Sequence, residues 1–415
     1  MKILQVLPSV ARRVSGEVQL DVDFHEALAI YLDHFDHVKV ACPITETDAS
    51  GTGLERCKPV NDLDASKFSI IELPNAYSPK AFFKDYARVK SLLRRELERA
   101  DCLIASPHTL IGDWPTVAIR QAQKLRKPYV VEADVVYESV ARNGFSGDPD
   151  WKQFLKERMV SGFRRGYEKS LKSAKLALFQ GKTVFDAYSP YCNNAHKVEH
   201  HIPIYGRDHV TQDQLDAKLQ RIQSGAPLRI CYAGRLVSMK GPLDWVNTIH
   251  ELIKCGIDLE ATWLGDGPLL PIVQKQVAAA GIANKVRFPG YVSNRSAILD
   301  AIRSSDILLF CHKTEESARI LGEALACGCP IVGYASAYPV DLTAEYGGGL
   351  FSGLGDWSHL ADHIQRLDLD REALCSLVYQ AARSGSRFDR TKLLTERMML
   401  VKRYVRAPSE YRAVS

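Results

Sequence analysis

Two basic side chains stand five residues apart in the second half of the sequence. Arg235 follows Gly234, and Lys240 precedes Gly241. An apolar run at 228–233 predicts a buried strand before them, and 242–254 has the periodicity of a helix after them. A guanidinium and an ammonium between a strand and a helix can hold a diphosphate and neutralise the charge that grows on a leaving phosphate. Taken alone, the same pair also suits two solvated loop cations.

Two carboxylates, Glu315 and Glu323, lie eight residues apart further along the chain. An apolar strand at 307–310 precedes them, and a helix of small residues stops at Gly328. In an open α/β sheet, ligands bind beyond the carboxyl ends of the strands, where helix N-termini offer N–H groups and partial positive charge. Both carboxylates can face a ligand that rests on this helix. The alternative is that they only complement the helix dipole.

Two further strand exits lie between these pairs. The turn at 264–268 contains glycines that permit positive φ, and the strand exit at 288–292 carries Tyr291. The backbone near Tyr291 can pair with a base edge while the ring shapes a pocket; the alternative is a buried aromatic after a turn. Two cations, a niche for a base and two carboxylates along one sheet edge are the set that a nucleoside diphosphate sugar requires.

The elements that position these residues alternate between strand and helix. The first half predicts strands at 2–8, 38–42, 69–73, 102–105, 129–131, 176–179 and 197–204, with helices at 21–35, 81–100, 114–125 and 151–173. The second half predicts strands at 228–233, 259–264, 286–288, 307–310, 331–334 and 349–351. This alternation predicts an α/β fold of two Rossmann-like, doubly wound domains facing a central cleft. The predicted boundaries are 1–205, 206–385 and a helical segment at 386–415 that crosses back to the first domain. The first loop lacks a GxGxxG fingerprint.

Composition limits the class of protein. The chain has 415 residues, 46% hydrophobic and 25% charged, with a net charge of +5. These values are typical of a globular protein of two or three domains and do not require a nucleic-acid partner. The ten cysteines lack metal-ligand spacing, which predicts reduced thiols. Because no run of about 18 apolar residues occurs and the first residues form a strand, we expect a cytoplasmic protein without an exported leader.

The motifs at 228–351 resemble the C-terminal domain of retaining glycosyltransferases of the GT-B fold, the family-4 type also called glycosyl transferases group 1. The motifs are Ala-Gly-Arg-Leu followed by Lys-Gly, then Gly-Asp-Gly-Pro, Phe-Pro-Gly-Tyr-Val, and Glu-x7-Glu-Ala-Leu-Ala. In the first half the resemblance extends only to the fold. The resemblance implies that Arg235 and Lys240 bind the donor diphosphate, that Glu323 binds the ribose, and that Glu315 binds the transferred sugar. It also implies transfer with retention, no metal, and a leaving phosphate that accepts the acceptor's proton.

The sequence departs from this family at several positions. The usual Glu-Gly-Phe-Gly is replaced by Glu315-Glu316-Ser317-Ala318-Arg319, so we expect Glu316, Ser317, Ala318 and Arg319 to line the donor site in place of the glycines. The Gly-Gly of the first loop is reduced to one glycine, Gly16, which we expect near the donor phosphate together with Gly234. His108 and Asp134 follow strands of the first half and are the predicted acceptor-side residues.

The predicted partners are a UDP- or GDP-sugar donor and a glycan, lipid-linked or small-molecule acceptor. The runs at 80–95 and 151–172 mix basic and aromatic residues and can lie on anionic lipid, which suits a peripheral position at the inner membrane face; the alternative is two solvated helix faces. Two other classes of function stay open. One is a nucleotide-sugar epimerase or phosphorylase of similar shape, and the other is a non-enzymatic, membrane-associated basic α/β protein.

Overall fold

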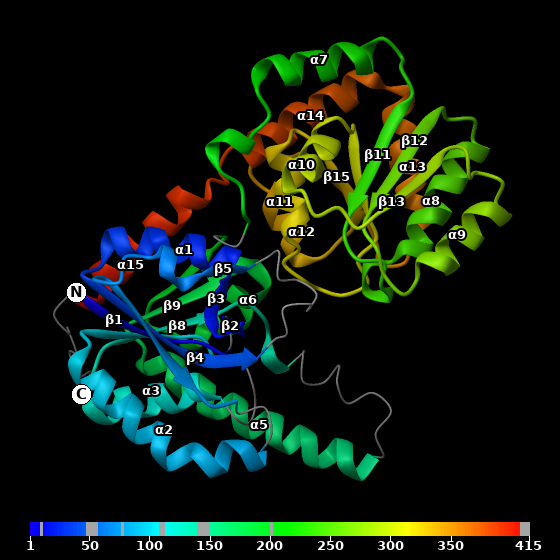
Figure 1. Cartoon of the computed structure of the whole chain (residues 1–415). Coiled ribbons are helices and arrows are strands. Elements are labelled where there is room, and N and C mark those ends of the chain that lie inside the picture. The colour runs from blue at the N-terminus through cyan, green and yellow to red at the C-terminus, as the bar shows by residue number, and fades with distance from the viewer. Residues whose placement is uncertain are drawn as a thin grey trace, which may run out of the picture. The chain divides into compact units, whose positions relative to one another are not determined.

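The computed structural model describes residues 1–8, 11–46, 57–75, 79–107, 113–138, 150–199 and 202–406. They form two compact α/β units (Figure 1), which confirms the predicted fold class. Unit 1 comprises Met1–Glu199 and Thr391–Ser415, and unit 2 comprises His200–Arg390. The division therefore falls six residues before the boundary expected from the sequence, and the last helix of the chain belongs to unit 1.

Unit 1 is built on a sheet whose central strands are all parallel. In order across the sheet they are β10 (Ala195–Val198), β9 (Leu176–Gln180), β8 (Tyr129–Ala133), β7 (Cys102–Ala105), β1 (Lys2–Val6), β4 (His37–Glu46) and β6 (Phe68–Leu73). Helices cover both faces, so side chains of both orientations along a strand are buried: Leu4 and Val6 enter one core cluster and Ile3 the other. Parallel strands of this kind have continuous apolar sequences, which is why their positions are predictable.

The helices of unit 1 fall into two layers (Figure 1). One layer consists of α1 (Val22–His34) and α15 (Arg390–Arg406), which share a core cluster. The other consists of α2 (Pro79–Arg99), α3 (Trp114–Leu125), α5 (Asp150–Ser173) and α6 (Gly181–Tyr188). Short 3-10 turns occur at η2 (Val60–Asp62) and η3 (Ser189–Tyr191). No helix in the described ranges is both long enough and apolar enough to cross a bilayer.

The segment between the first strand and the helix predicted at 21–35 contains strands that the sequence did not predict. It contains a hairpin of β2 (Ala11–Val14) and β3 (Glu17–Asp21), with β5 (Cys57–Pro59) paired to β3. Ser15 and Gly16 both have positive φ, 50° and 85°, as the tight turn of a two-residue hairpin requires. The helix begins only at Val22, where the Asp21 side chain accepts a hydrogen bond from the Asp23 backbone N–H.

Unit 2 has a six-stranded, fully parallel sheet. The order is β13 (Val286–Gly290), β12 (Leu259–Leu264), β11 (Leu228–Ala233), β14 (Ile307–Phe310), β15 (Ile331–Tyr334) and β16 (Gly349–Ser352). The chain runs outward from β11 to β13, then crosses to β14 and runs outward in the opposite direction. Because crossovers between parallel strands are right-handed, this reversal moves the connecting helices to the other face. The switch point, where ligands bind in such sheets, lies between β11 and β14.

The helices of unit 2 follow that rule (Figure 1). One face carries α8 (Pro242–Lys254), α9 (Leu270–Ala279) and α13 (Trp357–Leu369), and the other carries α7 (Gln212–Gln223), α10 (Arg295–Arg303), α11 (Arg319–Ala326) and α14 (Arg371–Gly385). A shorter helix, α12 (Ala337–Thr343), contacts β16, and 3-10 turns occur at η4 (Gly206–Asp208) and η5 (Ser238–Lys240). The segment 206–226, which precedes β11, contains α7, and this helix packs on α14 as part of unit 2.

Candidate donor-binding site

Three loops of unit 2 are joined to one another at the switch point of the sheet. The backbone N–H of Leu236, after β11, donates to the carbonyl of Asp266, after β12, at 3.0 Å. The backbone N–H of Lys313, after β14, donates to the carbonyl of Met239 at 2.8 Å. Backbone hydrogen bonds therefore connect the loops after β11 and β14, which carry the predicted ligand-binding residues.

Two glycines permit this close approach. A Cβ at Gly241 would lie 2.0 Å from the Cys311 carbonyl oxygen, and one at Gly265 would lie 2.0 Å from that of Gly234. Both have positive φ, 62° and 149°. Any side chain at either position would push the loops apart, because the neighbouring atom is backbone and cannot turn aside.

Lys240 is the best-defined charged group of the site. It ends η5, and its Nζ lies 2.5 Å from Oε1 of Glu316 in the loop that leads to α11. The two side chains are only 16% and 24% exposed. Since Glu316 is two residues before Ala318, the N-cap of α11, the ammonium group lies close to the start of that helix. A cation and a helix N-terminus side by side form a site for an anion.

His312 lies beside the same carboxylate. Its Nδ1 lies 3.3 Å from Glu316 Oε1, and the Tyr232 hydroxyl is 2.6 Å from its Nε2. Burial, and next the charge of Lys240, lower the pKa of His312 to about 3, so the ring is neutral near pH 7. Burial raises the pKa of Tyr232, which keeps its hydroxyl protonated as a donor to Nε2. When the Tyr232 hydroxyl donates to Nε2, the neutral ring carries its proton on Nδ1, on the side of Glu316.

The sequence analysis did not identify Tyr232 or His312 as site residues. Tyr232 belongs to a buried strand, and His312 follows one, so both look like core residues. The available signal was a polar aromatic and an imidazole at the carboxyl ends of the two strands that flank the switch point. Their contact joins residues 80 apart in sequence, which no local pattern shows.

The remaining predicted donor residues surround this network. Arg235 and Glu315 are exposed, and among the described residues neither side chain has a hydrogen-bond or ion-pair partner. Ser317 and Arg319 flank the N-cap Ala318, whose side chain makes no capping bond, so α11 begins with N–H groups that no side chain of its N-cap satisfies. Gly234 lies between β11 and Arg235.

Glu323 and Tyr291 have different surroundings from Lys240. Glu323, on α11, lies 3.7 Å from Arg295 on α10, which also pairs with Asp208 at 3.1 Å. Tyr291 follows β13, the edge strand, and is 62% exposed. The ring is therefore not a buried core aromatic. The ribose and base roles of these residues stay predictions.

The predicted residues of unit 1 are described separately. Gly16 lies at the tip of the β2–β3 hairpin, and Asp134 follows β8. Glu132, near the end of the same strand, pairs with the buried Arg397 of α15. His108 lies outside the described residues.

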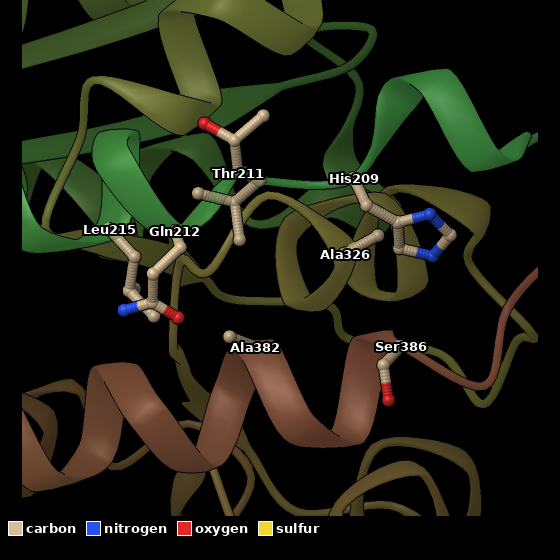
Figure 2. Close-up of a pocket in the computed structure, with 8 residues that line it drawn as sticks. His209, Thr211, Gln212, Leu215, Ala326, Ala382 and Ser386 are labelled. Atoms are coloured by element: carbon tan, nitrogen blue, oxygen red, sulfur yellow. The ribbon is translucent and has the colours of Figure 1, made fainter.

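A cavity of about 320 Å³ lies elsewhere in unit 2 (Figure 2). Ala382 and Ser386 form its α14 side, and the segment that leads into α7 lies opposite, with the end of α11 beside it. The predicted donor residues are absent from its lining, which consists of His209, Val210, Thr211, Gln212, Leu215, Ala326, Ala382 and Ser386. It is thus separate from the switch-point site. In the described parts of the chain, no cluster of three or more His, Cys, Asp or Glu side chains has a metal-binding arrangement.

The two-unit architecture is that of GT-B glycosyltransferases, and it matches solved structures over nearly the whole chain. The crystal structure of Anabaena Alr3699/HepE in complex with UDP matches 97% of this chain and 100% of its own length, with a TM-score of 0.68 and 16% identity. The structure of WaaG, a glycosyltransferase involved in lipopolysaccharide biosynthesis, matches 96% of this chain and 99% of its own, with a TM-score of 0.62 and 13% identity. At these identities the similarity establishes the fold alone.

Sequence similarity agrees with the fold. Residues 217–384, which lie within unit 2, match the family model for glycosyl transferases group 1, and this match supports the predicted resemblance to that group. A curated relative, the 2-deoxystreptamine N-acetyl-D-glucosaminyltransferase of Niallia circulans, is 24% identical over 260 residues, which cover 61% of this chain. The aligned region spans 64% of that relative's length, slightly less than two thirds.

Proposed function

We propose that this protein is a retaining glycosyltransferase that moves a sugar from a nucleoside diphosphate sugar to an acceptor without a metal ion. The observation that carries the proposal is the position of Lys240. Its ammonium group reaches the loop immediately before α11, whose N-cap side chain makes no capping bond. A positive charge beside a helix N-terminus at a switch point suits a diphosphate, and together they supply the stabilisation that a divalent cation would otherwise give.

Arg235 adds a second cation on the same loop. Its side chain is exposed and has no partner among the described residues, so the guanidinium can turn to a ligand without breaking an existing side-chain bond. Guanidinium groups bind phosphate oxygens in a bidentate manner, which also orients the leaving group. In the proposed transfer, the bond between the anomeric carbon and the phosphate oxygen breaks. The new bond to the acceptor oxygen forms on the same face, and the acceptor proton passes to the leaving phosphate.

The class of donor and acceptor belongs to the proposal as well. A UDP-sugar is supported by the UDP complex of Alr3699/HepE, and a GDP-sugar is the alternative. We propose a glycan, a lipid-linked sugar or a small polyol as acceptor. The Niallia circulans relative is named for transfer to 2-deoxystreptamine, and WaaG for lipopolysaccharide biosynthesis. Detection of a glycosylated acceptor by mass spectrometry separates transfer from epimerisation, which leaves the acceptor mass unchanged.

Calorimetric titration with UDP, GDP and ADP tests the proposed site. We expect the wild-type protein to bind one of them, and Arg235→Ala and Lys240→Ala to weaken that binding at least about tenfold, since each removes a charge-assisted contact worth about 1.5–3 kcal/mol. Turnover should be lost in both variants. Lys285→Ala is the control, because Lys285 pairs with Asp258 at 2.8 Å at the opposite, amino edge of the sheet. Near wild-type turnover in an Arg235→Ala, Lys240→Ala double variant would contradict the assignment.

A further inference from the structure

Lys240 and Glu316 form an ion pair at the position where the proposed function requires a diphosphate. Lys240 Nζ is 2.5 Å from Glu316 Oε1, so the ammonium group already has an anionic partner in the ligand-free protein. Both side chains are mostly shielded from water, and ion pairs are stronger there than at the surface. A phosphate oxygen that binds Lys240 must either replace this carboxylate or lie next to it, and two adjacent anions repel each other.

Glu316 has a second neighbour besides Lys240. Its Oε1 lies 3.3 Å from Nδ1 of His312, whose ring is neutral, and the Tyr232 hydroxyl lies 2.6 Å from the other ring nitrogen. Lys240 lies on the short η5 turn and Glu316 in the loop before α11, so the ammonium group can turn to another anion while Glu316 stays in its own loop.

The neighbouring lysine does not substitute for Lys240. Lys313 Nζ lies 3.0 Å from Oδ2 of Asp244, and the other Asp244 contact is the Tyr334 hydroxyl at 2.7 Å. Lys313 is thus paired with a different, buried carboxylate, that of Asp244 on α8. The charged and titratable groups that face Glu316 among the described residues are Lys240 and His312, with Tyr232 behind the imidazole.

We propose that Glu316 is a built-in occupant of the diphosphate site, which binds Lys240 in the ligand-free protein and must be displaced by the nucleoside diphosphate. The inference rests on the proposed function, because it assumes that Lys240 is a diphosphate ligand. Glu316 then lowers the affinity for the donor's diphosphate, and by returning to Lys240 it assists release of the nucleoside diphosphate product. Glu316 therefore affects how tightly the donor binds and how fast the nucleoside diphosphate leaves. It does not take part in the chemical step.

The test is calorimetric titration of the full-length wild type, Glu316→Gln and Glu316→Ala with UDP, GDP and ADP. We expect both variants to bind the accepted nucleotide about three- to tenfold more tightly, the range expected for loss of one competing ion pair. Glu260→Gln is the matched control. It makes the same substitution in an exposed pair with Arg287, at 2.8 Å, near the amino end of β12, and should leave affinity unchanged.

The outcomes distinguish the inference from the proposed function. If the wild type binds none of the three nucleotides, or binds one equally well after Lys240→Ala, the proposed function fails. If wild type binds through Lys240 but Glu316→Gln and Glu316→Ala bind equally or more weakly, the inference alone is overturned, and Glu316 instead positions Lys240 or contacts the ligand. Thermal unfolding of each variant verifies that the measured affinities belong to folded protein.

Discussion

His312 is a buried base whose protonation opposes folding. Its pKa is about 3 in the folded protein, lowered by burial and by Lys240, against about 6.5 in an unfolded chain. Below pH 6.5 the unfolded chain therefore binds a proton that the folded protein does not. The stability contributed by the neutral ring is fully present above about pH 6.5 and decreases as the pH falls toward 3, by at most about 1.4 kcal/mol per pH unit.

We predict that His312→Gln reduces this pH dependence. Glutamine can accept from Tyr232 and donate to Glu316, but it does not titrate. Between pH 6.5 and pH 5 the wild type should lose up to about 2 kcal/mol more of its free energy of unfolding than the variant. Urea denaturation at the two pH values measures the difference. Parallel losses in both proteins would show that His312 does not titrate as described.

At the residue level, the sequence predicted which side chains could bind a ligand better than it predicted which other side chains they contact. Arg235 and Lys240 could be proposed because a guanidinium and an ammonium after a strand suit a diphosphate. The contact of Lys240 with Glu316 could not, because it joins two loops 76 residues apart and depends on side-chain conformation. The sequence also did not predict that Ser15 and Gly16 form a hairpin turn between β2 and β3.

At the element level, the close approach of the loops after β11 and β14 depends on Gly241. We predict that Gly241→Ala destabilises unit 2 by about 1–3 kcal/mol beyond the cost of a side chain at positive φ, because its Cβ would meet the Cys311 carbonyl at 2.0 Å. Gly256→Ala is the matched control. Its φ is 82°, but no atom lies within 4 Å of the added Cβ, so only the backbone cost of about 1–2 kcal/mol applies.

Denaturant unfolding of the two variants measures the difference between them. Gly241→Ala should also weaken nucleotide binding, because the η5 turn that carries Lys240 would move away from α11. Equal stability of the two variants would mean that the loops can separate at little cost. If Gly241→Ala binds the nucleotide as tightly as the wild type, the close contact between the loops is not required for nucleotide binding.

The strands were predictable where helices bury both faces of the sheet. The strands at 228–233, 259–264, 307–310 and 331–334 have the predicted bounds, because parallel strands covered by helices on both faces are continuous apolar runs. The β2–β3 hairpin was missed because Arg12 and Arg13 made its first strand look like a loop. The short helices α6 and α12 were missed because they have too few turns for a clear helical period.

Helix α2 presents a basic surface with one large apolar side chain. Its exposed residues include Lys80, Lys84, Arg88, Arg94, Arg95 and Arg99, and Phe83 is 68% exposed, whereas Val89, Leu93 and Leu97 face the core. Such a surface is expected to bind anionic lipid. This supports the proposal of a lipid-linked acceptor at a membrane surface.

Co-sedimentation with vesicles that contain about one third phosphatidylserine tests this surface. We predict that the wild-type protein pellets at low salt, that about 0.5 M salt releases it because exposed charges are screened, and that Lys84→Glu with Arg88→Glu prevents binding. Lys285→Glu removes a basic charge from unit 2 and is the control. Absence of the wild-type protein from the pellet at low salt would contradict the proposal.

At the level of the whole molecule, the chain returns to unit 1 after it completes unit 2. The sequence showed a basic helical segment at its end, but helical periodicity does not say which core an apolar face enters. In the structure, Leu394, Met398 and Val401 of α15 join the cluster of α1 and the unit 1 sheet. The decisive polar contact is that of Arg397, which is 4% exposed and binds both Glu132 and the Tyr31 hydroxyl.

We predict that Arg397→Ala destabilises unit 1 by about 3–5 kcal/mol, because it leaves the largely buried Glu132 carboxylate without its charged partner. Glu396→Ala alters the exposed neighbour on the same helix and should change stability by less than about 0.5 kcal/mol. Differential scanning calorimetry measures the effect, and limited proteolysis should release α15 earlier from Arg397→Ala than from Glu396→Ala. If both variants unfold like the wild type, α15 is held to unit 1 by its apolar side chains alone, and the ion pair contributes nothing to the connection between the two ends of the chain.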